Sequence, residues 1–487
     1  MSAFNLLPPS GATILAGADW SAGLAEGTLP VIDPSSGLEI YRLAAGGAAA
    51  IDRAVSAARA AADGPWGQMP AVERGRLLTR LGRAIEDHFD PLWQLESRDT
   101  GKPTTQAKAD IRACARYFEF YGGAADKHHG ETIPYQAGYA VLTWKEPYGV
   151  TGHIIPWNYP AQIFGRTIGG ALAAGNACVL KPAEDACLTP LALAQLALDV
   201  GFPPGALTVV TGLGTGAGAA LSAHPGLDHI SFTGSPQTAR AVQTAAAQHN
   251  RPVTLELGGK SPQIVFADAD LDRALPFITN AIVQNAGQTC SAGSRLLLED
   301  RVADRFLDTL ADRFAGLAAG PADRDLDCGP LINAHQKVRV DGYLNQARAD
   351  GVVTRGTGTV VADAPAGGSY VAPTLLDHVP VDHPIAREEV FGPVLTIFRF
   401  RDEAQAVQLA NATPFGLVAG VWTQDGGRQL RLARAVRAGQ IFINNYGAGG
   451  GVELPFGGMK KSGFGREKAL EGLDHFSVTK TVAIRHG

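Results

Sequence analysis

Cys290 stands in a loop of small and polar residues that could present a nucleophile. The apolar run from Ala274 to Val283 predicts a helix before this loop, and Leu296 to Leu298 predicts a strand after it. A thiolate attacks a carbonyl carbon readily if its pKa is lowered or a base lies nearby. A lone cysteine is more often a small packing residue, and nothing in the loop alone overturns that interpretation.

A carboxylate upstream of this loop is a candidate general base. Glu256 follows the apolar run from Pro252 to Leu255 and precedes two glycines, Gly258 and Gly259. A carboxylate at the end of a buried strand, beside glycines that admit a ligand, has the surroundings that general bases require. A salt bridge to Lys260 is the structural alternative, and Glu256 taken alone does not decide between the two.

Composition excludes several classes of protein. The chain has 487 residues, which predicts two or three domains. Its formal charge of −5, without a basic patch, argues against a nucleic-acid partner. No apolar run reaches the roughly 20 residues that span a bilayer, and Met1 to Asn5 do not begin a signal peptide. We therefore expect a cytoplasmic protein without a membrane partner.

The five cysteines are too few and too widely spaced for a disulfide framework or a metal site. The twelve histidines form no HxxxH or HxH pair, so we predict no metal. A reducing compartment fits this usage and would keep a catalytic thiol free.

Alternating elements predict an α/β fold with parallel sheets that helices cover on both faces. Residues 1–45 predict edge strands, and helices are expected at 48–62, 71–95 and 105–121. The regular part then places strands at 150–155, 177–180, 207–211 and 229–232, with helices at 161–174, 190–200, 216–223 and 237–248. This Rossmann-like unit ends near Leu257. A second α/β section, from about Ser261 to Pro455, carries strands at 262–265, 295–298 and 395–399 and helices at 302–315 and 335–349.

Two segments outside these units alternate in the manner of exposed strands. Gly130 to Pro147 predicts a hairpin, and the tail from Phe476 to Ile484 could pair with it. Exposed edges of this kind are a liability in a monomer, and pairing across subunits would hide them. We therefore expect a homo-oligomer.

Residues that follow three of the predicted strands could hold a dinucleotide. The glycines of 212–216 could turn backbone N–H groups toward a pyrophosphate, although a tight turn explains them equally well because the usual GxGxxG spacing is absent. Lys181 to Glu184 and Phe232 to Ser235 are stronger signals. They follow parallel strands, whose carboxyl ends are where dinucleotides bind.

Taken together, these motifs resemble the aldehyde dehydrogenase superfamily. Glu-Leu-Gly-Gly-Lys at 256–260, Gly-Gln-Thr-Cys at 287–290 and the glycine-rich run 455–467 carry the resemblance, which spans nearly the whole chain. It implies a Rossmann-like cofactor domain (1–128 and 148–257), a catalytic α/β domain (258–455) and a small β oligomerisation element (129–147 and 470–487). A homodimer or homotetramer is expected.

The resemblance also implies a mechanism. The Cys290 thiolate attacks an aldehyde, while Asn158 and the Cys290 amide stabilise the oxyanion. Hydride passes to the nicotinamide, and a water activated by Glu256 hydrolyses the thioester to the acid. Glu467 matches a carboxylate that assists proton relay near the base. The sequence departs from the family at Thr167, where most relatives carry a lysine, which puts that relay in doubt.

Cofactor residues are carried over from the resemblance in the same way. Lys181 and Glu184 would hold the adenosine ribose, and a carboxylate there favours NAD over NADP because it repels a 2′-phosphate. The full expected set is Ile154, Trp157, Lys181, Glu184, Gly214, Gly234, Ser235, Leu257, Glu389 and Phe391. Of these, Glu389 and Phe391 would position the nicotinamide ribose and ring, although Phe391 would by itself predict a core aromatic.

The expected substrate residues are Ile163, Arg166, Gln284 and Ser291. Arg166 matches a carboxylate-binding arginine of succinate-semialdehyde dehydrogenases, which suits a bidentate pair. The companion basic position is Gln284, however, and relatives that oxidise aromatic aldehydes can also carry an arginine at the equivalent of position 166. The substrate is therefore expected to be either an aromatic aldehyde or a carboxylate-bearing semialdehyde. A Cys-dependent esterase or thioesterase without redox chemistry is the alternative function.

Overall fold

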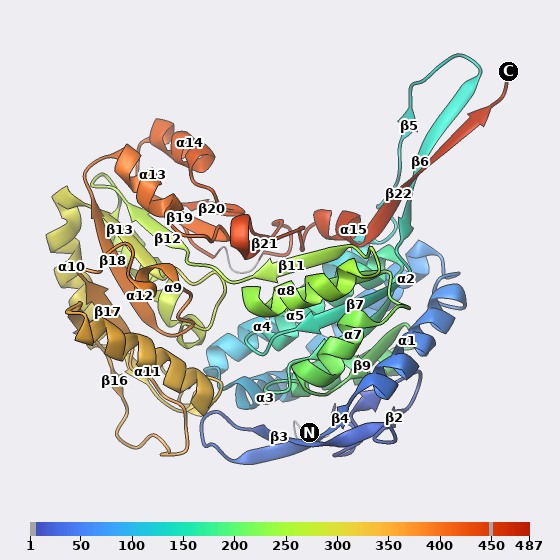
Figure 1. Cartoon of the computed structure of the whole chain (residues 1–487), viewed down its shortest axis with the longest axis horizontal. Helices are drawn as coiled ribbons and strands as arrows, with labels where there is room; N and C mark the ends of the chain where they lie inside the picture. Colours follow the sequence, from blue (N-terminus) through green and yellow to red (C-terminus); the bar gives the residue numbers. More distant parts are fainter. Residues whose placement is uncertain (1–5, 448–450) are drawn as a thin grey trace.

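The computed structural model describes residues 6–447 and 451–487, so that Met1 to Asn5 lie outside the described residues. Two α/β lobes stand side by side, and a β arm projects from them with the C-terminus at its tip (Figure 1). Each lobe has its own hydrophobic core. One core gathers residues between Leu6 and Leu257 together with Val452, Leu473 and Phe476, and the other gathers residues from Ile264 to Ala438.

The first lobe is built on an eight-stranded sheet in the order β2-β1-β9-β8-β7-β10-β11-β21. Its central strands are parallel, as the alternation predicted, while β1, β2 and β21 add antiparallel edges. The strands are β1 (Ile14–Leu15), β2 (Trp20–Ser21), β7 (Val150–Ile155), β8 (Ala177–Pro182), β9 (Leu207–Val210), β10 (His229–Gly234), β11 (Val253–Leu257) and β21 (Gly463–Phe464). A separate hairpin pairs β3 (Ala25–Ile32) with β4 (Glu39–Gly46).

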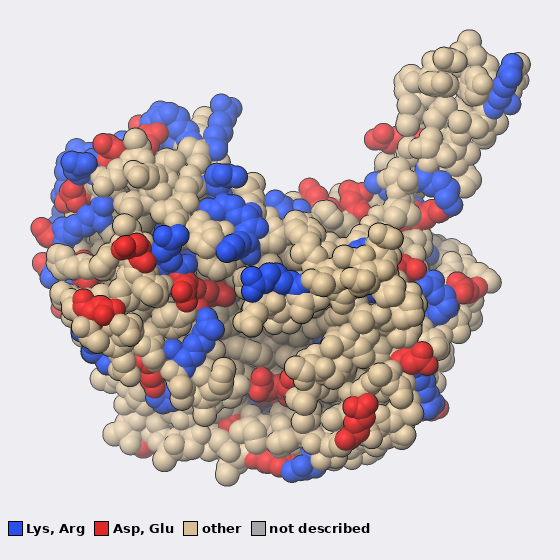
Figure 2. Space-filling model, in the orientation of Figure 1, with Lys and Arg blue, Asp and Glu red and all other residues tan. Residues whose placement is uncertain are grey.

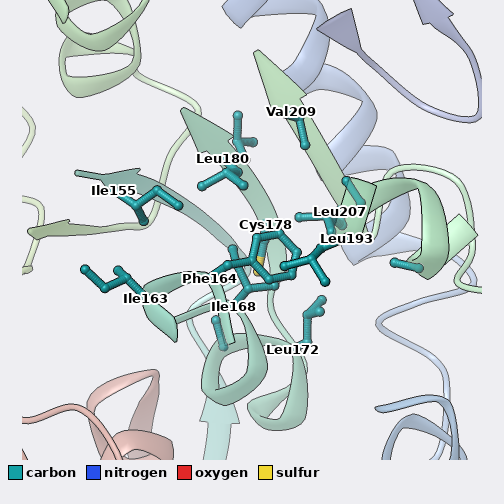
Figure 3. Close-up of a cluster of buried hydrophobic side chains, with 14 of the residues drawn as sticks. Ile155, Ile163, Phe164, Ile168, Leu172, Cys178, Leu180, Leu193, Leu207 and Val209 are labelled. Atoms are coloured by element: carbon teal, nitrogen blue, oxygen red, sulfur yellow. The ribbon is translucent and has the colours of Figure 1, made fainter. Parts of the chain in front are cut away.

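Helices cover both faces of this sheet (Figure 1). They are α1 (Ala48–Asp63), α2 (Ala71–Asp87), α3 (Phe89–Thr100), α4 (Thr104–Ala124), α5 (Pro160–Ala174), α6 (Leu188–Asp199), α7 (Ala219–Ala223) and α8 (Pro236–Ala247). Figure 3 shows apolar side chains of α5 and α6 packed on β8 and β9, with Cys178 among them as a small packing residue.

The single helix expected at 71–95 is wrong, because the chain breaks at His88 into α2 and α3. Pro91 explains the break. A proline in a continuous helix would lack the N–H for one backbone bond and would clash with the preceding turn, whereas a proline in the first turn of a new helix is tolerated. The helix expected at 216–223 also starts differently, since Gly214–Gly218 forms a π-helical turn before α7.

The second lobe is built on a seven-stranded sheet in the order β15-β17-β18-β13-β12-β19-β20. All neighbours are parallel except β15 and β17. The strands are β12 (Pro262–Val265), β13 (Arg295–Glu299), β15 (Val353–Thr357), β17 (Thr374–Asp377), β18 (Val394–Phe400), β19 (Val418–Trp422) and β20 (Gln440–Ile443). Its helices are α9 (Leu271–Val283), α10 (Asp300–Ala315), α11 (Ala334–Ala349), α12 (Pro384–Arg387), α13 (Glu403–Asn411) and α14 (Gly426–Ala435). The short strands β14 (Ala318–Ala319) and β16 (Thr359–Val360) pair beside it.

The predicted pairing of the hairpin with the tail is confirmed within one chain. β5 (Thr132–Ile133), β6 (Tyr139–Pro147) and β22 (Ser477–Arg485) form a three-stranded sheet, with Ser477 opposite Pro147 and Arg485 opposite Tyr139. A short helix, α15 (Glu471–His475), leads into β22. This sheet, called the arm below, is mostly uncharged on the face that Figure 2 shows. No described helix is long and apolar enough to cross a membrane.

Candidate active site

A cavity of about 490 Å³ lies where the two lobes meet. Residues from the carboxyl ends of β7, β10 and β11 form one wall, and the Cys290 loop, the segment around Glu389 and strands β19 and β20 contribute the other. The carboxyl ends of parallel strands are the usual ligand-binding edge of such sheets. The candidate base Glu256 lies at this edge, at the end of β11, whereas the candidate nucleophile Cys290 lies in the loop before β13. The structure brings both into one cavity.

The loop that carries Cys290 has a strained backbone. Helix α9 begins at the Asp270 cap, whose side chain accepts the Arg273 N–H, and it ends at Val283. Asn285 and Ala286 then adopt left-handed conformations, with φ of 50° and 51°. Such a conformation is unfavourable for alanine and persists only where the surroundings impose it.

Hydrogen bonds from both lobes impose that conformation. The Asn285 amide donates to the Asn158 carbonyl at 2.9 Å, and the Asn285 N–H donates to the Gln106 side chain at 2.8 Å. The Gln288 side chain accepts the Ile332 N–H at 2.9 Å. These bonds therefore fix the loop relative to both lobes.

Asn158 follows β7 and is separated by Tyr159 from Pro160, which starts α5 at a position where proline is favoured. Its side-chain nitrogen donates to the Gln288 carbonyl at 2.9 Å, two residues before Cys290 in sequence. An amide nitrogen carries two N–H groups, and among the described residues this is the only bond of the Asn158 nitrogen. The second N–H therefore remains for a ligand oxygen beside Cys290.

The Cys290 thiol keeps part of its surface exposed to the cavity. Burial in the surrounding protein raises its pKa to about 11, Arg166 lowers it, and Glu389 and Glu256 raise it further. At neutral pH the thiol is thus protonated, and thiolate formation needs a group that takes the proton.

Glu256 lies at the end of β11 and is 2% exposed. Burial, and next the neighbouring Glu467, raise the pKa of Glu256 well above its usual value, and Arg166 opposes them. Neither carboxylate oxygen has a hydrogen-bond partner among the described residues, and the same holds for the Lys260 ammonium. The Lys260 salt bridge that would have made Glu256 a structural residue is therefore absent from the described part of the chain.

Arg166 and Glu467 form an ion pair between α5 and the C-terminal segment, with both side chains buried. The Arg166 guanidinium also donates to the Thr233 hydroxyl at 3.1 Å and lies over the Phe456 ring. The cation beside Glu467 thus comes from position 166, directly before Thr167.

Thr167 takes part in a chain of hydrogen bonds that ends at the same carboxylate. The Ser231 hydroxyl donates to Glu467 at 2.8 Å, and the Thr167 hydroxyl donates to Ser231 at 3.1 Å. Since the Thr167 proton is used in that bond, His153 Nδ1 must donate to Thr167 across 2.7 Å. His153 Nε2 then accepts from the Thr151 hydroxyl at 2.8 Å. In each of these four hydrogen bonds the proton is donated in the direction of Glu467.

The sequence reasoning missed His153 and Ser231. Both are polar side chains buried inside short, mostly buried strands, and that is the signal by which they could have been found. A polar side chain inside a buried parallel strand requires a partner, but the sequence does not say which one. Lys468, Tyr446 and Phe456, which also line the cavity, were missed as well.

The expected cofactor residues fall into two groups. Trp157, Gly234, Ser235, Leu257, Glu389 and Phe391 line the cavity, and the Trp157 and Phe391 rings meet edge to face at 5.4 Å. Ile154, Lys181, Glu184 and Gly214 lie outside its lining but continue the same sheet edge. Glu184 pairs with Lys181 at 2.6 Å and accepts the Gly214 N–H at 3.2 Å, and Ile154 stands opposite Lys181.

All four expected substrate residues, Ile163, Arg166, Gln284 and Ser291, line the cavity. The Gln284 amide donates to the Tyr159 hydroxyl at 3.0 Å, which in turn meets the Thr289 hydroxyl at 2.8 Å. The Ser291 carbonyl accepts the Tyr446 hydroxyl at 2.5 Å. These bonds fix the residues on either side of Cys290.

The family model described as "Aldehyde dehydrogenase family" matches residues 20–482. The chain belongs to this family. It is 41% identical to a mitochondrial benzaldehyde dehydrogenase of Antirrhinum majus over 93% of this chain and 85% of that protein. Members of this family are oxidoreductases that act on aldehydes.

Solved structures of the family superpose closely on this fold. A candidate aldehyde dehydrogenase from Burkholderia cenocepacia is 62% identical, with a TM-score of 0.97 over 98% of this chain and 100% of that one. PnpE in complex with nicotinamide adenine dinucleotide is 38% identical, with a TM-score of 0.95 over 97% of each chain. The α/β arrangement of the described residues is therefore that of an aldehyde dehydrogenase.

Replacing Thr167 by valine tests the hydrogen-bond chain. The substitution leaves His153 and Ser231 without their buried partner, so we expect the free energy of unfolding to fall by about 1–3 kcal/mol. Urea unfolding of wild type, Thr167→Val and Thr167→Ser measures this. The serine variant keeps the hydroxyl and should lose less than the valine variant. Equal losses in both variants would mean that the methyl group, and not the hydroxyl, matters.

The buried His153 predicts a dependence of stability on pH. Burial, with His229 nearby, lowers the pKa of His153 to about 3, whereas an unfolded histidine titrates near 6.5. Between these values the unfolded state takes up a proton that the folded state does not. Stability is therefore complete above pH 6.5 and falls as the pH decreases toward 3.

A His153→Asn variant, which retains a donor toward Thr167, should lose part of this dependence. Between pH 6 and 5 its unfolding free energy should fall less steeply than that of the wild type, by about 1.4 kcal/mol per pH unit. Urea titrations at several pH values give both slopes. Identical slopes would show that His153 is protonated in the folded protein.

Proposed function

We propose that the chain oxidises an aldehyde to its carboxylic acid, with NAD as the hydride acceptor. The observation that carries this proposal is the convergence of Cys290, the Asn158 amide and a buried Glu256 on one cavity. The first can form a covalent adduct, the second can stabilise an oxyanion, and the third can take a proton from water.

The residues along the edge of the first sheet fit a dinucleotide. Gly234 and Ser235 precede α8, whose N-terminal N–H groups suit a pyrophosphate. Lys181 and Glu184 suit the hydroxyls of a ribose, and the Glu184 carboxylate would repel a 2′-phosphate, which favours NAD over NADP. The PnpE structure in complex with NAD supports this choice of cofactor.

In the first step the Cys290 sulfur forms a bond to the aldehyde carbon, and the thiol proton leaves to a neighbouring base. The Asn158 amide and the Cys290 N–H donate to the oxygen that becomes negative. A bound NAD would supply the acceptor for the hydride that leaves the same carbon. What remains on Cys290 is a thioester. The wall of the cavity holds the sulfur in place throughout, through the bonds that fix residues 285 to 288.

Glu256 completes the reaction. Its carboxylate takes a proton from a water molecule whose oxygen attacks the thioester carbon, so that the carbon–sulfur bond breaks and the acid leaves. A base is most effective when its pKa lies near the working pH, and burial beside Glu467 raises that of Glu256 in this direction. Arg166 and the Ser231 hydroxyl keep Glu467 in place.

The substrate is either an aromatic aldehyde or an aldehyde that carries a carboxylate. The rings of Tyr117, Phe442 and Phe456 line the cavity and suit an aromatic or extended apolar chain. The benzaldehyde dehydrogenase relative supports the aromatic choice. The two buried cations Arg166 and Lys468 favour an anion. The runner-up function is a Cys290-dependent esterase, which would need the nucleophile but no dinucleotide.

Two variants separate these functions. Cys290→Ala should abolish NADH formation from any aldehyde. Glu256→Gln should lower the steady-state rate by about 10²–10⁴, yet still release one equivalent of NADH in a burst because the thioester forms without hydrolysing. Stopped-flow absorbance with NAD and NADP in parallel measures this.

Cys178→Ala serves as the matched control, since Cys178 is buried in the core of the first lobe and should leave the rate unchanged. Cleavage of an ester by the wild type without turnover of any aldehyde would replace the dehydrogenase proposal by the esterase. A larger rate with NADP than with NAD would contradict the role given to Glu184.

We also propose a homodimer or homotetramer that forms through the arm. Its large side chains Tyr135, Trp144 and Ile484 are 65%, 48% and 48% exposed, and burying them in a subunit interface would be favourable. The double variant Trp144→Glu with Ile484→Glu should therefore shift the sedimentation of the protein toward the monomer. Leu430→Glu on α14, 68% exposed, is the control. A wild type that sediments as a monomer would rule the assembly out.

A cytoplasmic location is part of the same proposal. All five cysteines carry free thiols, which a reducing compartment would preserve. Fractionation of cells, with the chain followed by antibody, tests the location, and enrichment in an organelle or outside the cell would contradict it.

A further inference from the structure

Lys468 lies directly after Glu467, in a short segment with a left-handed backbone. Its φ is 62° and that of Ala469 is 50°. Glu467 and Phe456 exchange two backbone hydrogen bonds of 2.7 and 2.8 Å, and the Ala469 N–H donates to the Val452 carbonyl at 2.8 Å. A lysine adopts this conformation only where its neighbours impose it. The imposed conformation makes Lys468 part of the cavity wall.

The Lys468 ammonium lies inside the protein. The residue is 8% exposed, and its nitrogen stands 5.2 Å from the centre of the Phe456 ring and 5.9 Å from that of Tyr117. Both rings line the cavity. A lysine normally keeps its ammonium in water, so this burial is costly unless the charge serves a ligand or balances another charge. Burial, and next the neighbouring Arg166, lower the pKa of Lys468 to about 8, while Cys290 and Glu256 oppose them.

Arg166 is less suited to a ligand than its place in the sequence indicates. Its guanidinium is paired with Glu467 and donates to Thr233, so the protein fixes its orientation through two of its nitrogens. A rigid guanidinium that is held in this way cannot turn toward a substrate without breaking a buried ion pair. The ammonium of Lys468 sits on a flexible four-carbon chain and carries three N–H donors, so a ligand can share it with other acceptors.

The charges close to Cys290 also favour an anion. Arg166 and Lys468 contribute two positive charges, and Glu467 contributes a carboxylate that is paired with Arg166. Burial raises the pKa of Glu256 well above its usual value, because it disfavours the charged carboxylate. Farther along the wall, Asp110 pairs with the buried Lys102. Two cations, Arg166 and Lys468, thus line the cavity beside the nucleophile, together with the carboxyl groups of Glu256 and Glu389.

We propose that Lys468 binds the carboxylate of an aldehyde substrate, so that the preferred substrates are carboxylate-bearing aldehydes and not neutral aromatic ones. This inference rests on the proposed aldehyde oxidation. The carboxylate pairs with the Lys468 ammonium, the spacer packs against the Tyr117 and Phe456 rings, and the aldehyde carbon reaches the Cys290 sulfur. An ion pair formed away from water is stronger than one at a surface, which gives the lysine its specificity.

Pairs of aldehydes that differ only in charge test the proposal. We would measure kcat and KM of the wild type for 4-formylbenzoate against 4-formylbenzamide, and for succinate semialdehyde against butanal. At least one anionic aldehyde should have a kcat/KM at least tenfold above that of its neutral partner. In Lys468→Met this preference should fall at least tenfold, mainly through KM, whereas Lys468→Arg should keep most of it. Lys461→Met, at an exposed lysine outside the cavity, is the matched control.

Equal losses for both members of a pair in Lys468→Met would assign Lys468 a structural role and overturn the proposal. A wild type without preference for either anion would overturn it too. Calorimetric titration of the wild type and Lys468→Met with 4-methylbenzoate and 4-methylbenzamide gives a readout that needs no turnover. If no aldehyde is oxidised, but the wild type binds the benzoate and the variant does not, the proposed oxidation fails and the anion subsite stands. If aldehydes are oxidised but the wild type does not bind the benzoate, the proposed oxidation stands and the anion subsite at Lys468 fails.

Discussion

The buried ion pair between Arg166 and Glu467 is the interaction on which the rest of the site depends. It joins α5, which lies in the core of the first lobe, to a segment that arrives some 300 residues later in the chain. Glu467 in turn raises the pKa of Glu256, and its backbone bonds to Phe456 place Lys468. Removing either partner would leave an uncompensated buried charge. The base and Lys468 would then lose their positions together.

Part of the backbone strain in the described residues lies around the same cavity. Asn285, Ala286, Phe391 and Lys468 all have positive φ, and all lie in or beside its walls. None is a glycine, so each conformation costs energy that the fold must supply elsewhere. For residues 285 and 286, hydrogen bonds to Gln106 and Asn158 of the other lobe stabilise the unfavourable conformation. The geometry of the nucleophile therefore depends on the contact between the lobes.

Much of this could be predicted from the sequence, and the exceptions have a common cause. Apolar periodicity gave most strands and helices within a few residues because burial of one face is a local pattern. The helix break at His88 was missed, since the pattern continues across it. Which side chains surround Glu467 could not be predicted either. Arg166, Ser231 and Glu467 are far apart in the chain, and their pairing depends on how β10, α5 and the C-terminal segment pack.

Charge close to Cys290 links substrate binding to the chemistry. Burial already makes the thiolate costly, as the raised pKa of Cys290 shows, and any further negative charge nearby would raise that cost. A carboxylate-bearing aldehyde brings such a charge. If the carboxylate binds beside the Lys468 ammonium, the pair is neutral overall and destabilises the thiolate only slightly. A neutral aldehyde would leave the positive charge of Lys468 in place and favour the thiolate directly. The gain from Lys468 with an anionic substrate must therefore come from binding and orientation, which is why its loss should appear in KM before kcat.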